Sequence, residues 1–142
     1  MKTFYVVIPC GAKKLPTVAT ADLLYTGSYH LACKAYALSI APRQNVLILS
    51  AQHGIVTLDQ IIAPYNLKMG DKGCVDAARV REQATAQGLF AAPVVAVGGE
   101  KYMRVVREVW PAAIFPLGVR GGMGVQMQAL KAMRGRLPDA LR

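Results

Sequence analysis

The chain has 142 residues, of which 54% are hydrophobic, a size and composition typical of one domain with its own core. This composition excludes a disordered chain, and no apolar run reaches the roughly 18 residues that a membrane helix needs. The 17 Lys and Arg against 8 Asp and Glu give a net charge of +9, typical of proteins that meet phosphate groups, with a simple solubility role as the alternative. We therefore expect a single cytoplasmic domain over residues 1–142, with no membrane partner.

Four short aliphatic segments, each ended by Gly, Pro or Ser, are typical of buried parallel strands. In chain order they cover residues 3–9, 45–50, 92–98 and 113–117. Helical patterns cover residues 28–41, 74–88, 100–110 and 122–133. Strands that alternate with helices predict an α/β fold of three layers, with a four-stranded, mostly parallel sheet and helices on both faces.

The stretch from residue 54 to residue 73 is the longest one without a predicted helix or strand. Such stretches are uncommon inside a compact domain and often carry function. Pro64, Gly70 and Gly73 favour an ordered flap over a helix.

The segments that follow the first two strands carry polar groups, and ligands of open α/β sheets bind beyond the carboxyl ends of strands. Cys10 and Gly11 follow the first strand, and Lys13 and Lys14 add positive charge, although both lysines could equally be solvated on a surface turn. Ser50, Gln52 and His53 follow the second strand. Histidine is the side chain that most readily gives and takes a proton near neutral pH, so His53 is a candidate acid, base or ligand donor, with a structural role as the alternative.

The segments that follow the last two strands are rich in glycine and open helices. Paired glycines at a helix N-terminus leave backbone amides and the positive end of the helix dipole free for an anion. Arg120 lies among the glycines of the last segment and offers a planar fork for phosphate. The ligand-binding residues expected at this edge are Cys10, Gly11, Lys13, Lys14, Tyr25, Tyr65, Gly98, Gly99, Tyr102, Arg120, Gly121 and Gly122.

Tyrosines and a few carboxylates complete the candidate site. Aromatic faces near basic groups are used to stack bases, which is why the tyrosines are included. For catalysis we select His53 and Ser50 with Asp59 as the carboxylate, and Asp71 and Glu100 as the alternatives to Asp59. The three cysteines and two histidines match no zinc pattern, so no metal and no cofactor is expected.

Several of these motifs together resemble a family of small bacterial and phage domains known as domain of unknown function 6884. The matching residues are 10–14 (CGAKK), 24–27 (LYTG), 47–54 (LILSAQHG), 62–65 (IAPY) and the Gly98-Gly99-x-x-Tyr102 pattern. The resemblance spans most of the chain and implies the cytoplasm of a bacterium or of a phage-infected host. It implies no particular activity.

The order of strands and loops is similar, more weakly, to the uracil-DNA glycosylase fold and to a domain of archaeosine-type tRNA enzymes. In those proteins the loops after the first and last strands hold a flipped base. Residues 115–118 (FPLG) resemble the last loop of that fold, whereas Cys10, Gly11 and Ala12 stand where the glycosylases carry a water-activating Asp.

The function expected from the sequence is an enzyme that acts on a nucleotide or nucleic acid, most simply by cleaving or exchanging an N-glycosidic bond. The alternative is a protein that binds nucleotides or nucleic acid without catalysis, such as an accessory or phage counter-defence protein. A third option is thiol chemistry at Cys10, because the neighbouring lysines could lower the pKa of its thiol.

Overall fold

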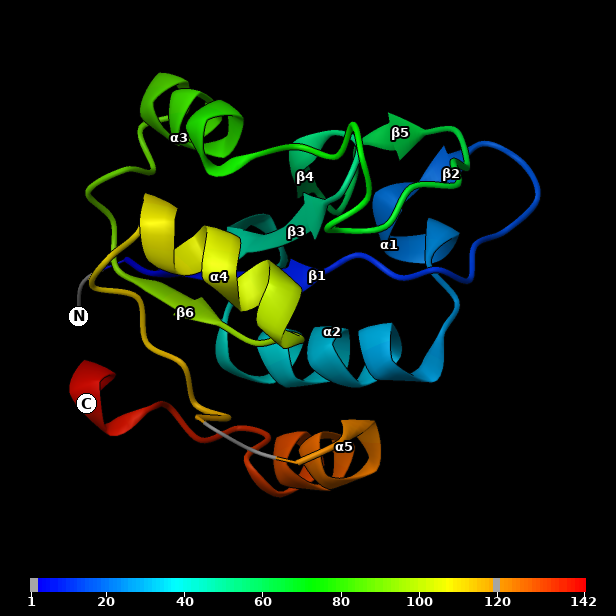
Figure 1. Ribbon diagram of the computed structural model, residues 1–142. Coiled ribbons are helices and arrows are strands. Elements are labelled where there is room, and N and C mark those ends of the chain that lie inside the picture. The colour runs from blue at the N-terminus through cyan, green and yellow to red at the C-terminus, as the bar shows by residue number, and fades with distance from the viewer. Residues whose placement is uncertain (1–2, 119–120) are drawn as a thin grey trace.

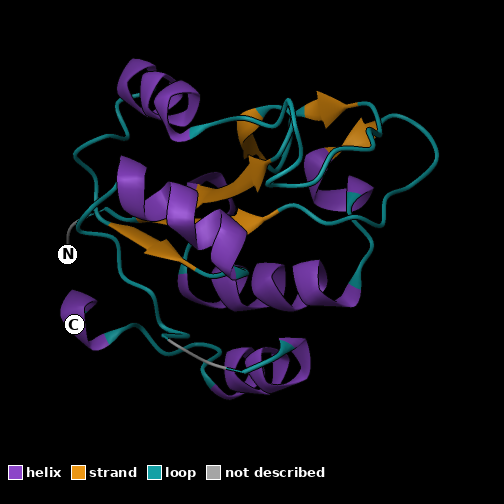
Figure 2. Ribbon diagram, viewed as in Figure 1, coloured by secondary structure: helices purple, strands orange, loops and turns teal. Residues whose placement is uncertain are grey.

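The computed structural model describes residues 3–118 and 121–142 and has a four-stranded sheet at its centre, in the order β4-β3-β1-β6 (Figures 1 and 2). Strand β1 (Tyr5–Pro9) pairs in parallel with β3 (Val46–Ser50) on one side and with β6 (Val94–Ala96) on the other. Strand β4 (Gly54–Thr57) runs antiparallel to β3. The prediction of an α/β fold with a four-stranded, mostly parallel sheet is confirmed.

The fourth strand is not the one that the sequence indicated. Of residues 113–117 only Ile114 joins the sheet, through a single parallel bridge to Val95. Pro111 precedes this segment and Pro116 lies within it, and a proline cannot donate a hydrogen bond to a neighbouring strand. The fourth strand is instead β4, which forms the edge of the sheet next to β3 and lies in the segment expected to be irregular. Gly54 allows this reversal, because it pairs with Ser50 across a tight turn and has a φ angle of +73°.

Helices cover both faces of the sheet. Helix α2 (Ser28–Ile40) packs under β1 and β3, and α5 (Met123–Ala132) packs against α2 (Figure 1). Helices α3 (Ala77–Ala86) and α4 (Glu100–Val109) contact each other and lie over the opposite face. All four predicted helices are confirmed, with ends that differ by at most three residues. No helix in the described ranges is long and apolar enough to cross a membrane.

A small unit at one end of the sheet was not predicted. It consists of β2 (Ala19–Thr20), the short helix α1 (Ala21–Leu24) and β5 (Ile61–Ile62), which pairs antiparallel with β2. Two 3-10 turns, Arg43–Asn45 and Asp139–Leu141, complete the described elements. These short strands have no hydrophobic alternation long enough to be recognised in the sequence.

Two polar side chains are buried among the mostly apolar core of the described residues, Ser50 and His30. Ser50 is the last residue of β3, and His30 lies in the first turn of α2, where its ring contacts the carbonyl of Pro9 at the end of β1. Because both residues meet the carboxyl ends of parallel strands, they mark the edge at which ligands of such sheets bind.

Candidate functional site

A cavity of about 490 Å³ opens beyond the carboxyl ends of β1 and β6. Its lining comes from five segments: the loop after β1, the start of α2, the long loop before α3, the start of α4 and the start of α5. We call it the Cys10 cavity. Its lining residues are Pro9, Cys10, Gly11, Ala12, Lys13, Gly27, Ser28, Tyr29, His30, Lys68, Met69, Asp71, Gly99, Lys101, Tyr102, Met123 and Gln126.

Three helices present their N-terminal turns to this cavity. The N-cap residues of α2, α4 and α5 are Gly27, Gly99 and Gly122, and no side chain in the described part of the molecule caps any of the three. Helix α3, which does not reach the cavity, has an Asp76 N-cap whose carboxylate accepts a hydrogen bond from the Arg79 amide at 2.9 Å. Uncapped first turns carry free amides and the positive end of the helix dipole, so this cavity is suited to an anion.

Charged side chains around the cavity have the same sign as the helix ends. Lys13, Lys68 and Lys101 line it, and all three are positively charged at neutral pH. Asp71 is the one carboxylate among the described lining residues, and its Oδ2 atom accepts a hydrogen bond from the Lys68 amide at 2.9 Å. The local charge is therefore strongly positive.

The inner wall combines apolar surface with weak hydrogen-bonding groups. The Cys10 Sγ lies 3.1 Å from the Tyr102 hydroxyl, and the Tyr29 hydroxyl donates to the side-chain carbonyl of Gln126. Burial raises the pKa of both Tyr102 and Tyr29, so both hydroxyls keep their protons at neutral pH. Such a wall suits the neutral part of a ligand.

His30 lies in this wall and is 2% exposed. Its Nδ1 atom lies 2.8 Å from the Pro9 carbonyl oxygen, which only accepts, so the ring proton is on Nδ1 and Nε2 is an acceptor. Within residues 3–118 and 121–142, Nε2 has no hydrogen-bond partner. Burial lowers the pKa of His30 to about 4, against a smaller opposite effect of the Pro9 carbonyl, which keeps the ring neutral near pH 7.

Beside the cavity lies a group that we call the tyrosine cluster, formed by the buried Tyr25 and Ser50 and the half-buried Tyr65 and Lys14. The Tyr65 hydroxyl lies 2.7 Å from Ser50 Oγ and 2.6 Å from the Tyr25 hydroxyl. Lys14 Nζ lies 4.3 Å from the centre of the Tyr65 ring and 5.6 Å from that of Tyr25. Burial raises the pKa of Tyr65, and raises that of Tyr25 to about 12, while it lowers the pKa of Lys14. The tyrosine cluster touches the cavity wall through the Tyr25 and His30 rings, whose centres are 5.0 Å apart.

The three predicted catalytic residues do not come together. His53 contacts the Tyr65 ring edge-on at 5.4 Å and its amide donates to Ser50 Oγ, but neither His53 nor Ser50 lines the cavity. Asp59 follows β4 and so lies near the amino end of β3. Its carboxylate is 81% exposed and pairs with Arg43 at 2.6 Å. The grouping of Asp59 with Ser50 and His53 is therefore wrong, because β4 reverses the chain and carries Asp59 to the other edge.

Of the predicted ligand-binding residues, five line the cavity: Cys10, Gly11, Lys13, Gly99 and Tyr102. Lys14, Tyr25 and Tyr65 belong to the tyrosine cluster instead. Gly121 and Gly122 are exposed in the turn before α5, where Gln126 donates to the Gly121 carbonyl at 2.9 Å. Arg120 lies outside the described residues. The sequence missed His30, Tyr29 and Gln126, although the Gly27-Ser28 start of α2 has the same uncapped pattern as Gly98-Gly99.

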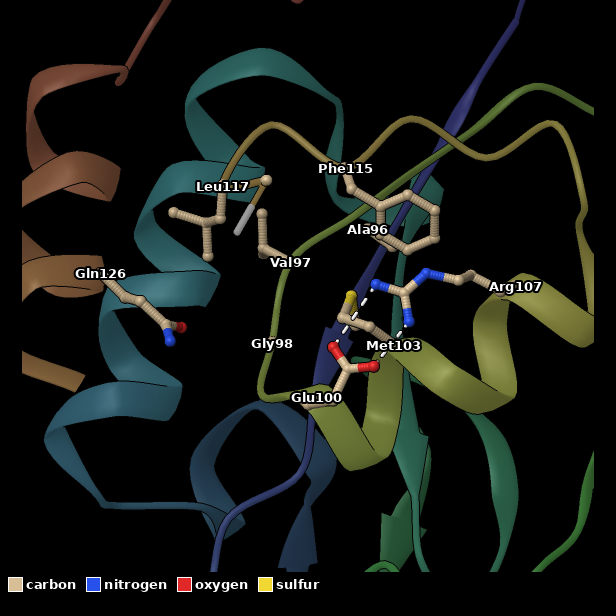
Figure 3. A pocket seen from close by; sticks show the side chains of 10 residues that line it. Ala96, Val97, Gly98, Glu100, Met103, Arg107, Phe115, Leu117 and Gln126 are labelled. Atoms are coloured by element: carbon tan, nitrogen blue, oxygen red, sulfur yellow. Dashed lines mark hydrogen bonds and ion pairs between the residues drawn. The ribbon is translucent and has the colours of Figure 1, made fainter. Parts of the chain in front are cut away.

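A second, smaller cavity of about 280 Å³ lies on the other side of Gly98, and we call it the Arg107 cavity (Figure 3). Glu100 holds the Arg107 guanidinium through contacts of 2.8 and 3.4 Å, and the guanidinium lies over the Phe115 ring at 5.0 Å. The Arg107 hydrogen bond lowers the pKa of the Glu100 carboxyl. The Glu100 carboxylate is thus paired with Arg107 of the same helix. Gln126 lines both cavities.

Gly98 lines the Arg107 cavity, and its neighbour Gly99 lines the Cys10 cavity. Replacing Gly98 tests whether the backbone between the two cavities requires glycine. Its φ angle is +152°, and an added Cβ would lie 3.0 Å from Met103 Cε and 3.3 Å from the Pro9 ring. We expect Gly98→Ala to lower the free energy of unfolding by about 1–3 kcal/mol in urea unfolding, because the backbone would be strained.

Gly124→Ala is the matched control for Gly98→Ala. Gly124 lies in α5, has no positive φ and has open space around its Cα. Its replacement is expected to be neutral or to stabilise the protein by up to about 1 kcal/mol. Equal effects at both positions would contradict the strained wall.

Comparisons with known proteins complete the description of the site. No curated protein and no solved structure matches the chain. One family does match, over residues 5–132, and it is described as a family of unknown function, DUF6884. This match covers the sheet, the Cys10 cavity and the tyrosine cluster, and it reaches the end of α5. The chain therefore belongs to the DUF6884 family.

Proposed function

We propose that the protein binds a nucleotide, or one nucleotide unit of a nucleic acid, in the Cys10 cavity. The observation that carries this proposal is the meeting of three uncapped helix N-termini with three lysines at one cavity. Free amides and ammonium groups are the usual partners of phosphate in proteins. The capped N-terminus of α3, away from the cavity, indicates that the open glycine caps are a feature of this edge.

The inner wall supports the second half of the proposal. Tyr29, Tyr102, Met69 and Met123 give it aromatic and thioether surface that suits a base or a sugar. A cavity of this volume falls within the range that small-molecule sites occupy, roughly 300–1,000 Å³.

Catalysis on the bound nucleotide is the finer proposal. Cleavage of an N-glycosidic bond needs a carboxylate near the sugar to stabilise positive charge or to activate water. Asp71 is our candidate for this role, because it lines the cavity. In this proposal the helix N-termini hold the phosphate and Asp71 faces the sugar.

Binding without catalysis is the alternative, and one observation favours it. The hydroxyls of Ser50, Tyr65 and Tyr25 are bonded to one another, and His53 contacts the Tyr65 ring outside the cavity. Ser50 and His53, selected from the sequence for catalysis, are thus engaged in contacts outside the cavity. Asp71 remains as the described carboxylate that faces the cavity.

Replacing two cavity lysines tests the binding proposal. We expect the double variant Lys13→Gln with Lys101→Gln to weaken nucleotide or oligonucleotide binding by at least about tenfold, or about 1.4 kcal/mol. The measurement is isothermal titration at low salt, with the four nucleoside monophosphates and a mixed-sequence single-stranded oligonucleotide. Lys131→Gln, an exposed change in α5 outside the cavity, is the control for a loss of positive charge, and it removes one charge where the double variant removes two.

The same samples separate an enzyme from a binder. Chromatography measures the release of free base from these compounds. Catalysis would be supported if the parent protein releases base and Asp71→Asn still binds but releases none. If the parent protein binds these compounds but releases base from none of them, the alternative of binding without catalysis is supported. Equal weakening by Lys131→Gln and by the double variant would remove the Cys10 cavity from the proposal.

A further inference from the structure

The charge around the Cys10 cavity exceeds what one phosphodiester requires. Lys13, Lys68 and Lys101 each contribute a full positive charge, and each of the three helix N-termini contributes roughly half a charge. Asp71 is the single described carboxylate that opposes them. A phosphodiester within a strand carries one negative charge, whereas a phosphomonoester carries nearly two at pH 7.

The arrangement of the donors also favours a terminal group. The first turns of α2, α4 and α5, the loop after β1 and the segment with Lys68 all border the same cavity. A nucleic-acid strand bound through an internal phosphate must leave the site in two directions. Proteins that track a strand use an extended groove for this purpose, and here the donors gather at one point.

The buried ring of His30 gives a second, independent indication of a ligand. It lines the cavity, is 2% exposed, and its Nε2 acceptor has no partner in the described part of the chain. A buried acceptor without a donor costs free energy, and an N–H or O–H group of a ligand would remove that cost. The dianion of a phosphomonoester has no such hydrogen on its phosphate group, whereas a base or a sugar has one.

We propose that the Cys10 cavity recognises a phosphomonoester that carries a hydrogen-bond donor, as found in a nucleoside monophosphate or at the phosphorylated end of a strand. The phosphate lies against the first turns of α2, α4 and α5 and the three lysines. The base or sugar lies along the wall that contains His30 and Tyr102. This inference rests on the proposed nucleotide binding and narrows it to one class of phosphate.

Matched pairs of ligands test this inference by isothermal titration. The first pair is a nucleoside monophosphate and its nucleoside, for each of the four bases. The second pair is one oligonucleotide with and without a 5′-phosphate. The inference predicts that the phosphorylated member binds at least about tenfold more tightly in one pair or both, as expected for several charge-assisted contacts.

The two pairs also identify the source of the phosphomonoester. A gain in the first pair alone indicates a free nucleotide, and a gain in the second indicates the end of a strand. Inorganic phosphate is expected to bind more weakly than the preferred monophosphate, because it has no base or sugar to contact the wall that contains His30 and Tyr102.

Two results would overturn the inference, and they differ in what they leave standing. Equal affinity for both oligonucleotides, with no binding of any monophosphate, would show recognition of internal diesters and would leave the proposed nucleotide binding intact. If no compound binds at low salt, both this inference and the proposed nucleotide binding are contradicted. Lys101→Gln should reduce the gain from the phosphate, and Lys131→Gln should preserve it.

Discussion

Replacing Ser50 with alanine is expected to lower the free energy of unfolding by about 2–3 kcal/mol, although it removes a single oxygen atom. Ser50 is 0% exposed, and its Oγ accepts hydrogen bonds from the amides of Gln52 at 3.2 Å and His53 at 3.0 Å. These two bonds occupy both lone pairs of the hydroxyl, so Ser50 must donate its own proton to Tyr65. Tyr65 in turn donates to Tyr25. Alanine would leave two turn amides without their acceptor and the half-buried Tyr65 hydroxyl without its donor.

Urea unfolding of three variants tests this account. Tyr65→Phe keeps the ring but breaks the hydroxyl chain in the middle, and it is expected to destabilise the protein by about 1–3 kcal/mol. Ser39→Ala is the control, because Ser39 also makes two hydrogen bonds through its hydroxyl but is exposed. Its effect should stay within roughly 0.5 kcal/mol. Similar losses in Ser39→Ala and Ser50→Ala would contradict the buried chain.

The sheet could be predicted from the sequence to the extent that its strands are long and apolar. Residues 3–9 and 45–50 are aliphatic runs, and they form β1 and β3 as expected. Strand β4 was missed because it is only four residues long and its pairing depends on the turn at Gly54. Residues 113–117 have an equally apolar pattern, but Pro111 before them, Pro116 among them and the short β6 leave room for one bridge only.

The cavity could be predicted in part, because the carboxyl ends of parallel strands meet at one edge. This rule correctly brought Cys10, Gly99 and Tyr102 together. It failed for Asp59, since the antiparallel β4 carries the chain back to the opposite edge, where Arg43 holds the carboxylate. His30 carried no local signal, because a histidine within a helix has the same sequence pattern whether it is buried or exposed.

The contacts of the tyrosine cluster could not be predicted at all. Tyr65 lies in the long loop before α3, which was expected to be a flap, and its hydroxyl joins Ser50 and Tyr25. Sequence distance gives no information on such a contact, because it depends on how residues 58–76 fold back over the sheet. The outcome is that Ser50, chosen for catalysis, is hydrogen-bonded to Tyr65, chosen for ligand binding, beside the cavity.

Acid is expected to destabilise this protein through His30. Burial depresses the pKa of the folded ring to about 4, and Lys34 contributes in the same direction, whereas the unfolded chain takes up a proton near the usual value of about 6.5. The unfolded state therefore binds more protons between these two values. The contribution of His30 to the free energy of unfolding is fully present above about pH 6.5. It is lost as the pH falls towards 4, and the total loss is about 3 kcal/mol.

Urea unfolding at several pH values between 7 and 4.5 measures this loss, and His30→Gln supplies the comparison, because carboxylates also begin to titrate in this range. Glutamine cannot be protonated, so the variant should be less stable than the parent at pH 7, and the gap should narrow as the pH falls. A variant with His53→Gln keeps His30 and should follow the parent. If the gap between the parent and His30→Gln stays constant over the whole range, the ring takes up its proton equally in the folded and unfolded states. Burial would then not hold the ring neutral in acid, and the ligand donor inferred from the buried Nε2 acceptor would lose support.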